Sequence, residues 1–199
     1  MNSLQESALK EASNIGAGHA ASALSQLMGR HVSVHVPGVR VASPRVFLTE
    51  LDPQTLVVGS YLKVLSDANG SILFLLAEDD AYKLVDLLLN QVPGSTSSLG
   101  DMEQSALKET GLIVGASYLN ALGEIMHRTF IPSVPSILMD RAEIVFARAF
   151  EGKAPNLLIG IRNELVEATT KIRCHLLFLP EADGLPSLLS ALGFDRSKS

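Results

Sequence analysis

The sequence has a single cysteine, Cys174, so an internal disulfide is excluded and a reducing compartment such as the cytoplasm is expected. It has no excess of basic residues. The 16 Lys and Arg against 21 Asp and Glu give a net charge of −5, which argues against a nucleic-acid partner. No run of Lys or Arg suits a membrane surface, and no apolar run approaches the roughly 18 residues of a membrane span. Residues 1–14 carry acids and no apolar core, so we expect no signal peptide there.

What the chain does have is an internal repeat. The pentapeptide SALKE begins at Ser7 and again at Ser105, 98 positions later, and alignment at this offset gives 12 identities over 31 positions. Further along, residues 72–89 and 175–192 each read as an apolar run, an acidic turn and a Leu-rich helix. Two copies, each about half the chain, indicate a duplication rather than a solenoid.

We therefore expect one domain over residues 1–199, built of two repeats related by a pseudo-twofold axis. The repeats span about 1–92 and 101–195, and residues 91–101, rich in Ser, Gly and Pro, read as the linker between them. The hydrophobic content of 47% and charged content of 19% are those of a globular protein.

Each repeat is predicted to begin with a long helix, over about residues 3–28 and 101–127. Ser3 and Asp101 are the predicted N-caps, and Gly29 is expected to end the first helix.

The remainder of each repeat carries strand signals, and Asn69-Gly70 is predicted as a hairpin turn. Strands in meander order, with the helices kept apart, predict an α+β fold with long helices on a mostly antiparallel sheet. The predicted strands are residues 31–41, 55–65, 71–77, 142–151, 156–165 and 171–179.

The first helix places Ser7, Glu11 and Asn14 at i, i+4 and i+7, on one stripe of one face. Asn is a mediocre residue inside a helix, and Gly16 and Gly18 each cost up to about 1 kcal/mol relative to Ala. Close approach of another backbone or of a partner protein would explain them. The alternative from the residues alone is a solvated Glu11, an Asn14 that caps a loop, and glycines that permit tight helix packing.

The pattern Ser7-x-x-x-Glu11-x-x-Asn14, followed by IGAGHAASALSQLMGRHVSVHVP, resembles the CheC family of chemotaxis phosphatases, which includes CheC, CheX and part of FliY. The resemblance covers nearly the whole chain, including the tandem layout and the order of one helix followed by strands. It implies hydrolysis of the phospho-aspartate of a response-regulator receiver domain, CheY-P in the standard case.

By this resemblance Glu11 would pair with a lysine of the receiver, and Asn14 would orient a water for in-line attack. Ser7 and Gly18 would contact the partner. No cofactor of the chain's own is expected, because the receiver would supply its Mg²⁺ and acidic cluster.

The second copy departs from the pattern. Ser105 and Glu109 keep their places, but Leu112 stands where the first copy has Asn14. Leucine cannot hydrogen-bond water, and Asn120 lies over two turns away, so we expect one working site and a second that at most docks a partner. The second helix could also serve only packing.

A rival interpretation is a non-catalytic adaptor that binds a receiver or a CheD-like deamidase, since CheC-type proteins also resemble the middle domain of FliM. The remaining candidates are weaker. His31 and His35 lack a third metal ligand, and Cys174 and His175 point to opposite sides of a predicted strand. No nucleotide-binding glycine motif is present.

Overall fold

The computed structural model describes residues 2–42, 52–65, 69–149, 158–181 and 184–194. Two 26-residue helices, α1 and α4, are its longest elements. The helices are α1 (Ser3–Met28), α3 (Glu78–Leu88), α4 (Asp101–Met126), α5 (Ala142–Ala149) and α6 (Gly184–Ala191). The strands are β1 (Val32–Ala42), β2 (Leu56–Leu65), β3 (Gly70–Ala77), β4 (Ile131–Pro132), β5 (Ser136–Arg141), β6 (Leu158–Glu167) and β7 (Arg173–Pro180).

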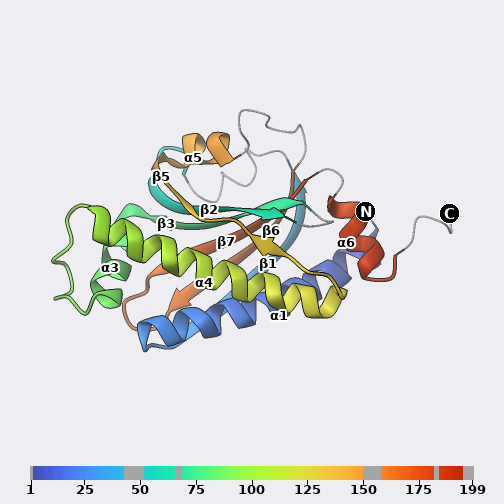
Figure 1. The fold of residues 1–199 in the computed structure, drawn as a ribbon, viewed down its shortest axis with the longest axis horizontal. Helices are drawn as coiled ribbons and strands as arrows, with labels where there is room; N and C mark the ends of the chain where they lie inside the picture. Colours follow the sequence, from blue (N-terminus) through green and yellow to red (C-terminus); the bar gives the residue numbers. More distant parts are fainter. Residues whose placement is uncertain (1, 43–51, 66–68, 150–157, 182–183, 195–199) are drawn as a thin grey trace.

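In the described part of the chain the strands form one seven-stranded sheet, in the order β1-β6-β7-β3-β2-β4, with β5 also paired to β2 (Figure 1). Every pair is antiparallel. Strands of the two halves pair with each other where β1 meets β6, where β7 meets β3, and where β2 meets β4 and β5. The α+β fold with an antiparallel sheet is confirmed.

The centre of the sheet has the symmetry that the repeat predicts. There β3 of the first half pairs with β7 of the second, and β2 and β6 flank them. Ile72 lies opposite Phe178, and Leu75 lies opposite His175. In the alignment of 72–89 with 175–192, position 72 matches 175 and position 75 matches 178, so these two pairs exchange under a local twofold rotation.

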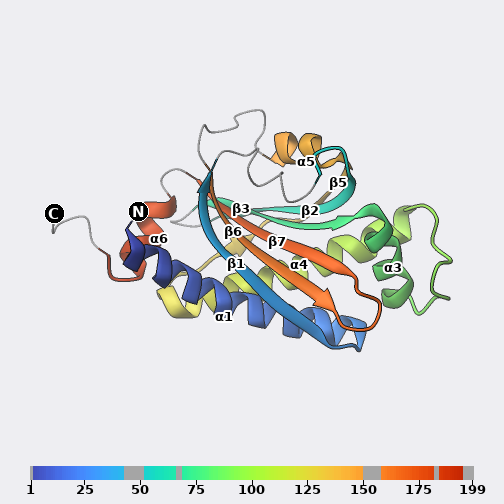
Figure 2. The ribbon, with the colours of Figure 1, turned by 180° about the vertical axis from the view of Figure 1, so that it is seen from behind.

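The two long helices lie side by side, antiparallel, on the same face of the sheet (Figures 1 and 2). Their contact centres on Tyr118 of α4, which is fully buried and whose ring packs against Phe178 of β7 at a centroid distance of 6.1 Å. The Tyr118 hydroxyl lies 3.1 Å from Oγ of Ser13 on α1. Helix α5 covers part of the opposite face with a smaller apolar cluster. One helix face of each long helix is therefore committed to the core, and the other faces solvent.

Several sequence predictions need correction. The N-cap of α1 is Asn2, whose side chain forms a capping box with Gln5, so Ser3 is already helical. The N-cap of α4 is Gly100, so the predicted cap Asp101 is the first helical residue. The predicted turn residue Gly70 already belongs to β3, opposite Val64, and residues 66–68, which precede the predicted turn at Asn69-Gly70, lie outside the described residues.

The segment predicted as a strand over 142–151 is wrong, because residues 142–149 form helix α5. The alternation of apolar residues there also fits a helical period, since Ala142, Val145, Phe146 and Ala149 are the buried positions. Burial of Val145 and Phe146 against the outer face of the sheet decides between the two periods. Strands β4 and β5 were not predicted.

Two buried carboxylates shape the connections between elements. Asp86 of α3 accepts hydrogen bonds from Gly94, Ser95 and Thr96, which holds the segment before α4. Although burial by itself would raise the pKa of Asp86, these hydrogen bonds lower it.

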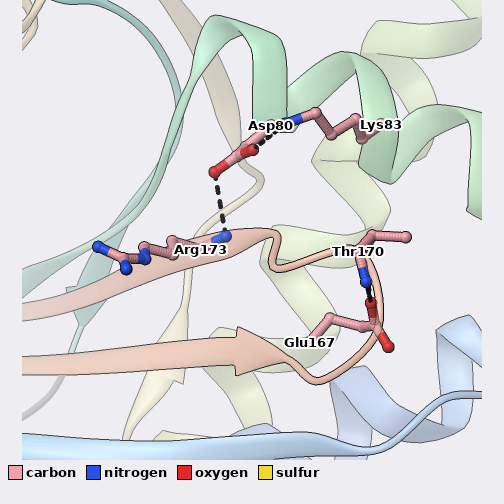
Figure 3. A network of polar contacts seen from close by, with 5 residues as sticks. All are labelled: Asp80, Lys83, Glu167, Thr170 and Arg173. Atoms are coloured by element: carbon pink, nitrogen blue, oxygen red, sulfur yellow. Dashed lines mark hydrogen bonds and ion pairs between the residues drawn. The ribbon is translucent and has the colours of Figure 1, made fainter. Parts of the chain in front are cut away.

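Figure 3 shows the second carboxylate, Glu167, directed at Thr170 in the turn between β6 and β7. Nearby, Asp80 of α3 forms an ion pair with Lys83 at 2.8 Å and accepts a hydrogen bond from the backbone N–H of Arg173. These contacts fix α3 and the hairpin turn. None of the helices in the described ranges is long and apolar enough to cross a membrane.

Candidate functional site

Helix α1 presents the predicted motif on its solvent face. Ser7, Glu11 and Asn14 are exposed, and Gly18 is half-buried. The opposite face, which includes Leu9, Ala12, Ser13, Gly16 and Ala17, is buried. Because the helix is anchored along its full length on one side, the exposed side chains stand on a fixed backbone.

Glu11 and Asn14 are also unengaged. Neither side chain has a hydrogen bond or ion pair with another residue that the structure describes. The alternative in which Asn14 caps a loop expects a hydrogen-bonded Asn14 side chain, which the structure lacks among the residues it describes, whereas a solvated Glu11 is expected under both interpretations. At 1.5 Å rise per residue the two Cα atoms are about 4.5 Å apart along the helix axis. A carboxylate and an amide are thus presented together to solvent.

The two glycines of α1 have different reasons to be glycine. A Cβ on Gly16 would lie 2.9 Å from two ring carbons of Tyr118 and 3.3 Å from its carbonyl oxygen, so Gly16 permits the close approach of α4. A Cβ on Gly18 would meet no atom within 4 Å. Internal packing therefore explains Gly16 and leaves Gly18 unexplained.

The second copy of the motif, on α4, is only partly presented. Ser105 and Glu109 are exposed, as their counterparts on α1 are. Leu112 is half-buried and packs against the main core cluster. At the neighbouring position Gly111, a Cβ would collide with Oγ and Cβ of Ser60 on β2, so α4 sits directly on the sheet there. In the second copy, the position that corresponds to Asn14 is thus occupied by Leu112, which packs against the core.

The other candidates do not assemble into a site. His31, His35 and His19 are exposed, and within the described ranges no three His, Cys, Asp or Glu side chains gather closely enough to hold a metal ion. Burial raises the pKa of the Cys174 thiol, with a smaller contribution from the charge of Asp80, which keeps the thiol protonated.

One hollow on α4 lies away from the motif. A hollow of about 420 Å³ lies at the C-terminal end of α4 and is lined by Asn120, Glu124, His127 and neighbouring residues. None of the predicted site residues lines it. The candidate site is a protruding helix face rather than a cavity, a shape that suits a macromolecular substrate better than a small molecule.

Sequence reasoning missed Tyr118, the residue that joins the two helices behind the motif. Its counterpart in the first copy is Ala20, so the repeat gave no signal for it. The buried carboxylates Asp86 and Glu167 were also missed. The nearby Ser and Thr residues were the available signal, since short polar side chains and backbone N–H groups in turns bind carboxylates.

Comparison with known proteins gives a consistent set of relatives. A profile of the CheC-like family matches residues 4–40. The CheY-P phosphatase CheC of Bacillus subtilis (strain 168) is 30% identical over 195 residues, covering 93% of this chain and 92% of the relative. The putative CheY-P phosphatase of the same type from Halobacterium salinarum is 18% identical, covering 92% and 94%.

Among solved structures, FliY of Thermotoga maritima superposes with a TM-score of 0.77 at 18% identity, covering 97% of this chain and 98% of that one. The FliM middle domain of H. pylori gives a TM-score of 0.67 at 15% identity, covering 96% and 99%. At these identities the structures establish the shared fold alone.

Proposed function

This chain belongs to the CheC-like family, and we propose that it dephosphorylates the phospho-aspartate of a CheY-like receiver domain in the cytoplasm. The observation that carries the proposal is the pair Glu11 and Asn14, exposed and unengaged on a helix whose other face is fixed in the core. The B. subtilis relative, which matches over nearly its whole length, is named a CheY-P phosphatase.

In this proposal Glu11 docks the receiver and Asn14 acts on the water. The carboxylate of Glu11 pairs with a lysine beside the phospho-aspartate and so places α1 over the phosphoryl group. The amide of Asn14 can both donate and accept hydrogen bonds, so it can hold a water in line with the scissile P–O bond. Phosphoryl transfer needs positioning and charge stabilisation more than covalent help, and one oriented water corresponds to about a hundredfold in rate.

The receiver would bring its own Mg²⁺ and acidic cluster, and the chain would supply no cofactor. As the water attacks phosphorus, the bond to the aspartate oxygen breaks, which releases inorganic phosphate and the free carboxylate of the receiver. An amide suits this position because a carboxylate there would be repelled by the charge of the phosphoryl oxygens.

The second helix would contribute at most to docking. Ser105 and Glu109 could still contact a receiver, but Leu112 offers no hydrogen bond and packs inward. We therefore propose one hydrolytic site per chain.

The test is phosphate release from a phosphorylated receiver of the same organism, with wild type, Asn14→Ala and Leu112→Asn. Asn14→Ala should reduce the stimulated rate about a hundredfold without unfolding, because Asn14 is exposed. Asn120→Ala is the matched control, since Asn120 is also an exposed helix asparagine. Undiminished release by Asn14→Ala would contradict the mechanism.

Leu112→Asn separates docking from packing at the second helix. Extra activity would mean that α4 still docks a receiver, and no change would mean that it serves packing alone. If wild type gives no stimulation and binds a receiver or a CheD-like protein tightly, the adaptor function replaces the phosphatase.

A further inference from the structure

Two large apolar side chains project from α1 into solvent beside the motif. Leu4 is 70% exposed and Ile15 is 42% exposed. On a helix, Leu4, Glu11 and Ile15 stand at i, i+7 and i+11, in one row along the same face. Leu4 lies about 10 Å before Glu11 along the helix axis, and Ile15 about 6 Å after it. The row therefore carries one charge with an apolar side chain on each side.

Internal packing does not account for these two residues. Neither Leu4 nor Ile15 belongs to a core cluster or packs at its margin, whereas the half-buried Leu112 and many other apolar residues do. Exposing two large apolar side chains on the face that holds an unengaged carboxylate and amide is unfavourable for the isolated chain. It becomes favourable once a partner covers that face.

The second copy repeats part of the arrangement. Leu4 corresponds to Met102 at the offset of 98, and Met102 is 65% exposed at the start of α4. Glu109 follows it at i+7, exposed like Glu11. The apolar residue and the carboxylate are thus kept in both helices, although the amide is present in only one. This pairing is independent of the hydrolytic residue, which indicates a role in docking.

We propose that the receiver domain buries Leu4 and Ile15 on either side of the cation that pairs with Glu11. This inference rests on the proposed function. It specifies the surface of the receiver that α1 contacts, which is one cation surrounded by apolar side chains. The apolar side chains and Asn14 are expected to have different effects, because only the former are buried on binding without contacting the reacting atoms. The apolar flanks contribute to affinity through the area removed from water, and Asn14 contributes to the rate of the chemical step.

The experiment separates KM from kcat for dephosphorylation of the phosphorylated receiver by wild type, Leu4→Ser, Ile15→Ser and the double variant. The double variant should raise KM by roughly tenfold or more, because about 25 cal/mol is lost per Å² of apolar surface left in water. Its kcat should stay within about twofold of wild type, since in the proposed complex the amide of Asn14, and neither apolar side chain, contacts the water.

Val92→Ser is the matched control. Val92 is 75% exposed and lies in the segment between α3 and α4, so its substitution removes a comparable apolar side chain away from the row. Far-UV circular dichroism and thermal unfolding should match wild type for all variants, because every substituted side chain is solvent-exposed.

The outcomes distinguish the inference from the function it rests on. Normal hydrolysis with an unchanged KM in the double variant would overturn the inference and leave the phosphatase function standing. Absence of stimulated hydrolysis by wild type would overturn both. A raised KM with an unchanged kcat, absent in Val92→Ser, is the result expected.

Discussion

Gly18→Ala should make the protein more stable and less active. Helix interiors favour Ala over Gly by about 0.8–1 kcal/mol. Because a Cβ at Gly18 meets no atom within 4 Å, no clash offsets that gain. For a chain of 199 residues this corresponds to a rise in melting temperature of about 2–4 °C.

The same methyl group would stand on the proposed docking face of α1, one turn beyond Asn14. If the receiver approaches the backbone there, the methyl displaces it by about 1 Å, a shift that can lower the rate by up to about a hundredfold. The assays are thermal unfolding and phosphate release from the phosphorylated receiver. Full activity in a stabilised variant would refute the close approach of the receiver at Gly18. Lowered stability would refute the inference that a Cβ at Gly18 meets no other atom.

Gly16→Ala, two residues away, is the control, and its expected change in melting temperature has the opposite sign. Its Cβ would press on the buried ring of Tyr118 and its carbonyl oxygen. Overpacking of this kind costs about 1–3 kcal/mol, which outweighs the gain in helix propensity. The melting temperature should therefore fall in Gly16→Ala and rise in Gly18→Ala.

Gly111→Ala should destabilise the protein by about 1–3 kcal/mol, because the new Cβ collides with both Oγ and Cβ of Ser60. In denaturant unfolding, adding Ser60→Gly should restore the lost stability, whereas adding Ser60→Ala, which keeps the Cβ, should not. Equal restoration by both substitutions would contradict this packing. Glu167 has a folded pKa of about 2 against an ordinary 4.5, since hydrogen bonds from Thr170 and Thr169 outweigh the effect of burial. Its contribution to stability is thus complete above pH 4.5 and is lost as the pH falls toward 2. Glu167→Gln should be less stable than wild type at pH 7, with a difference that shrinks over that window; a difference independent of pH would contradict the assignment.

The local features of this protein were predictable from sequence. The spacing of Ser7, Glu11 and Asn14 places them on one helix face whatever the helix packs against, because helical periodicity is a property of the backbone. The duplication follows from the repeat at an offset of 98 positions, and the long helices and most of the strands follow from patterns within about twenty residues. The antiparallel sheet follows from the order of the elements.

Other features needed contacts between residues far apart in the chain. Whether residues 142–149 form a strand or a helix depended on burial of Val145 and Phe146 against the sheet. The different reasons for Gly16 and Gly18 depended on Tyr118, over a hundred positions away. Sequence alone could not distinguish two glycines with equal local propensity.

The sequence by itself determined which residues could act: a carboxylate and an amide at fixed spacing in the first copy, and a leucine in place of the amide in the second. Only the tertiary structure decided which of them face solvent. Glu11 and Asn14 remain in solvent, while Leu112 packs against the core. The physical reason is that exposure is set by how α1 and α4 lie against each other and against the sheet, and that arrangement depends on side chains remote from the motif.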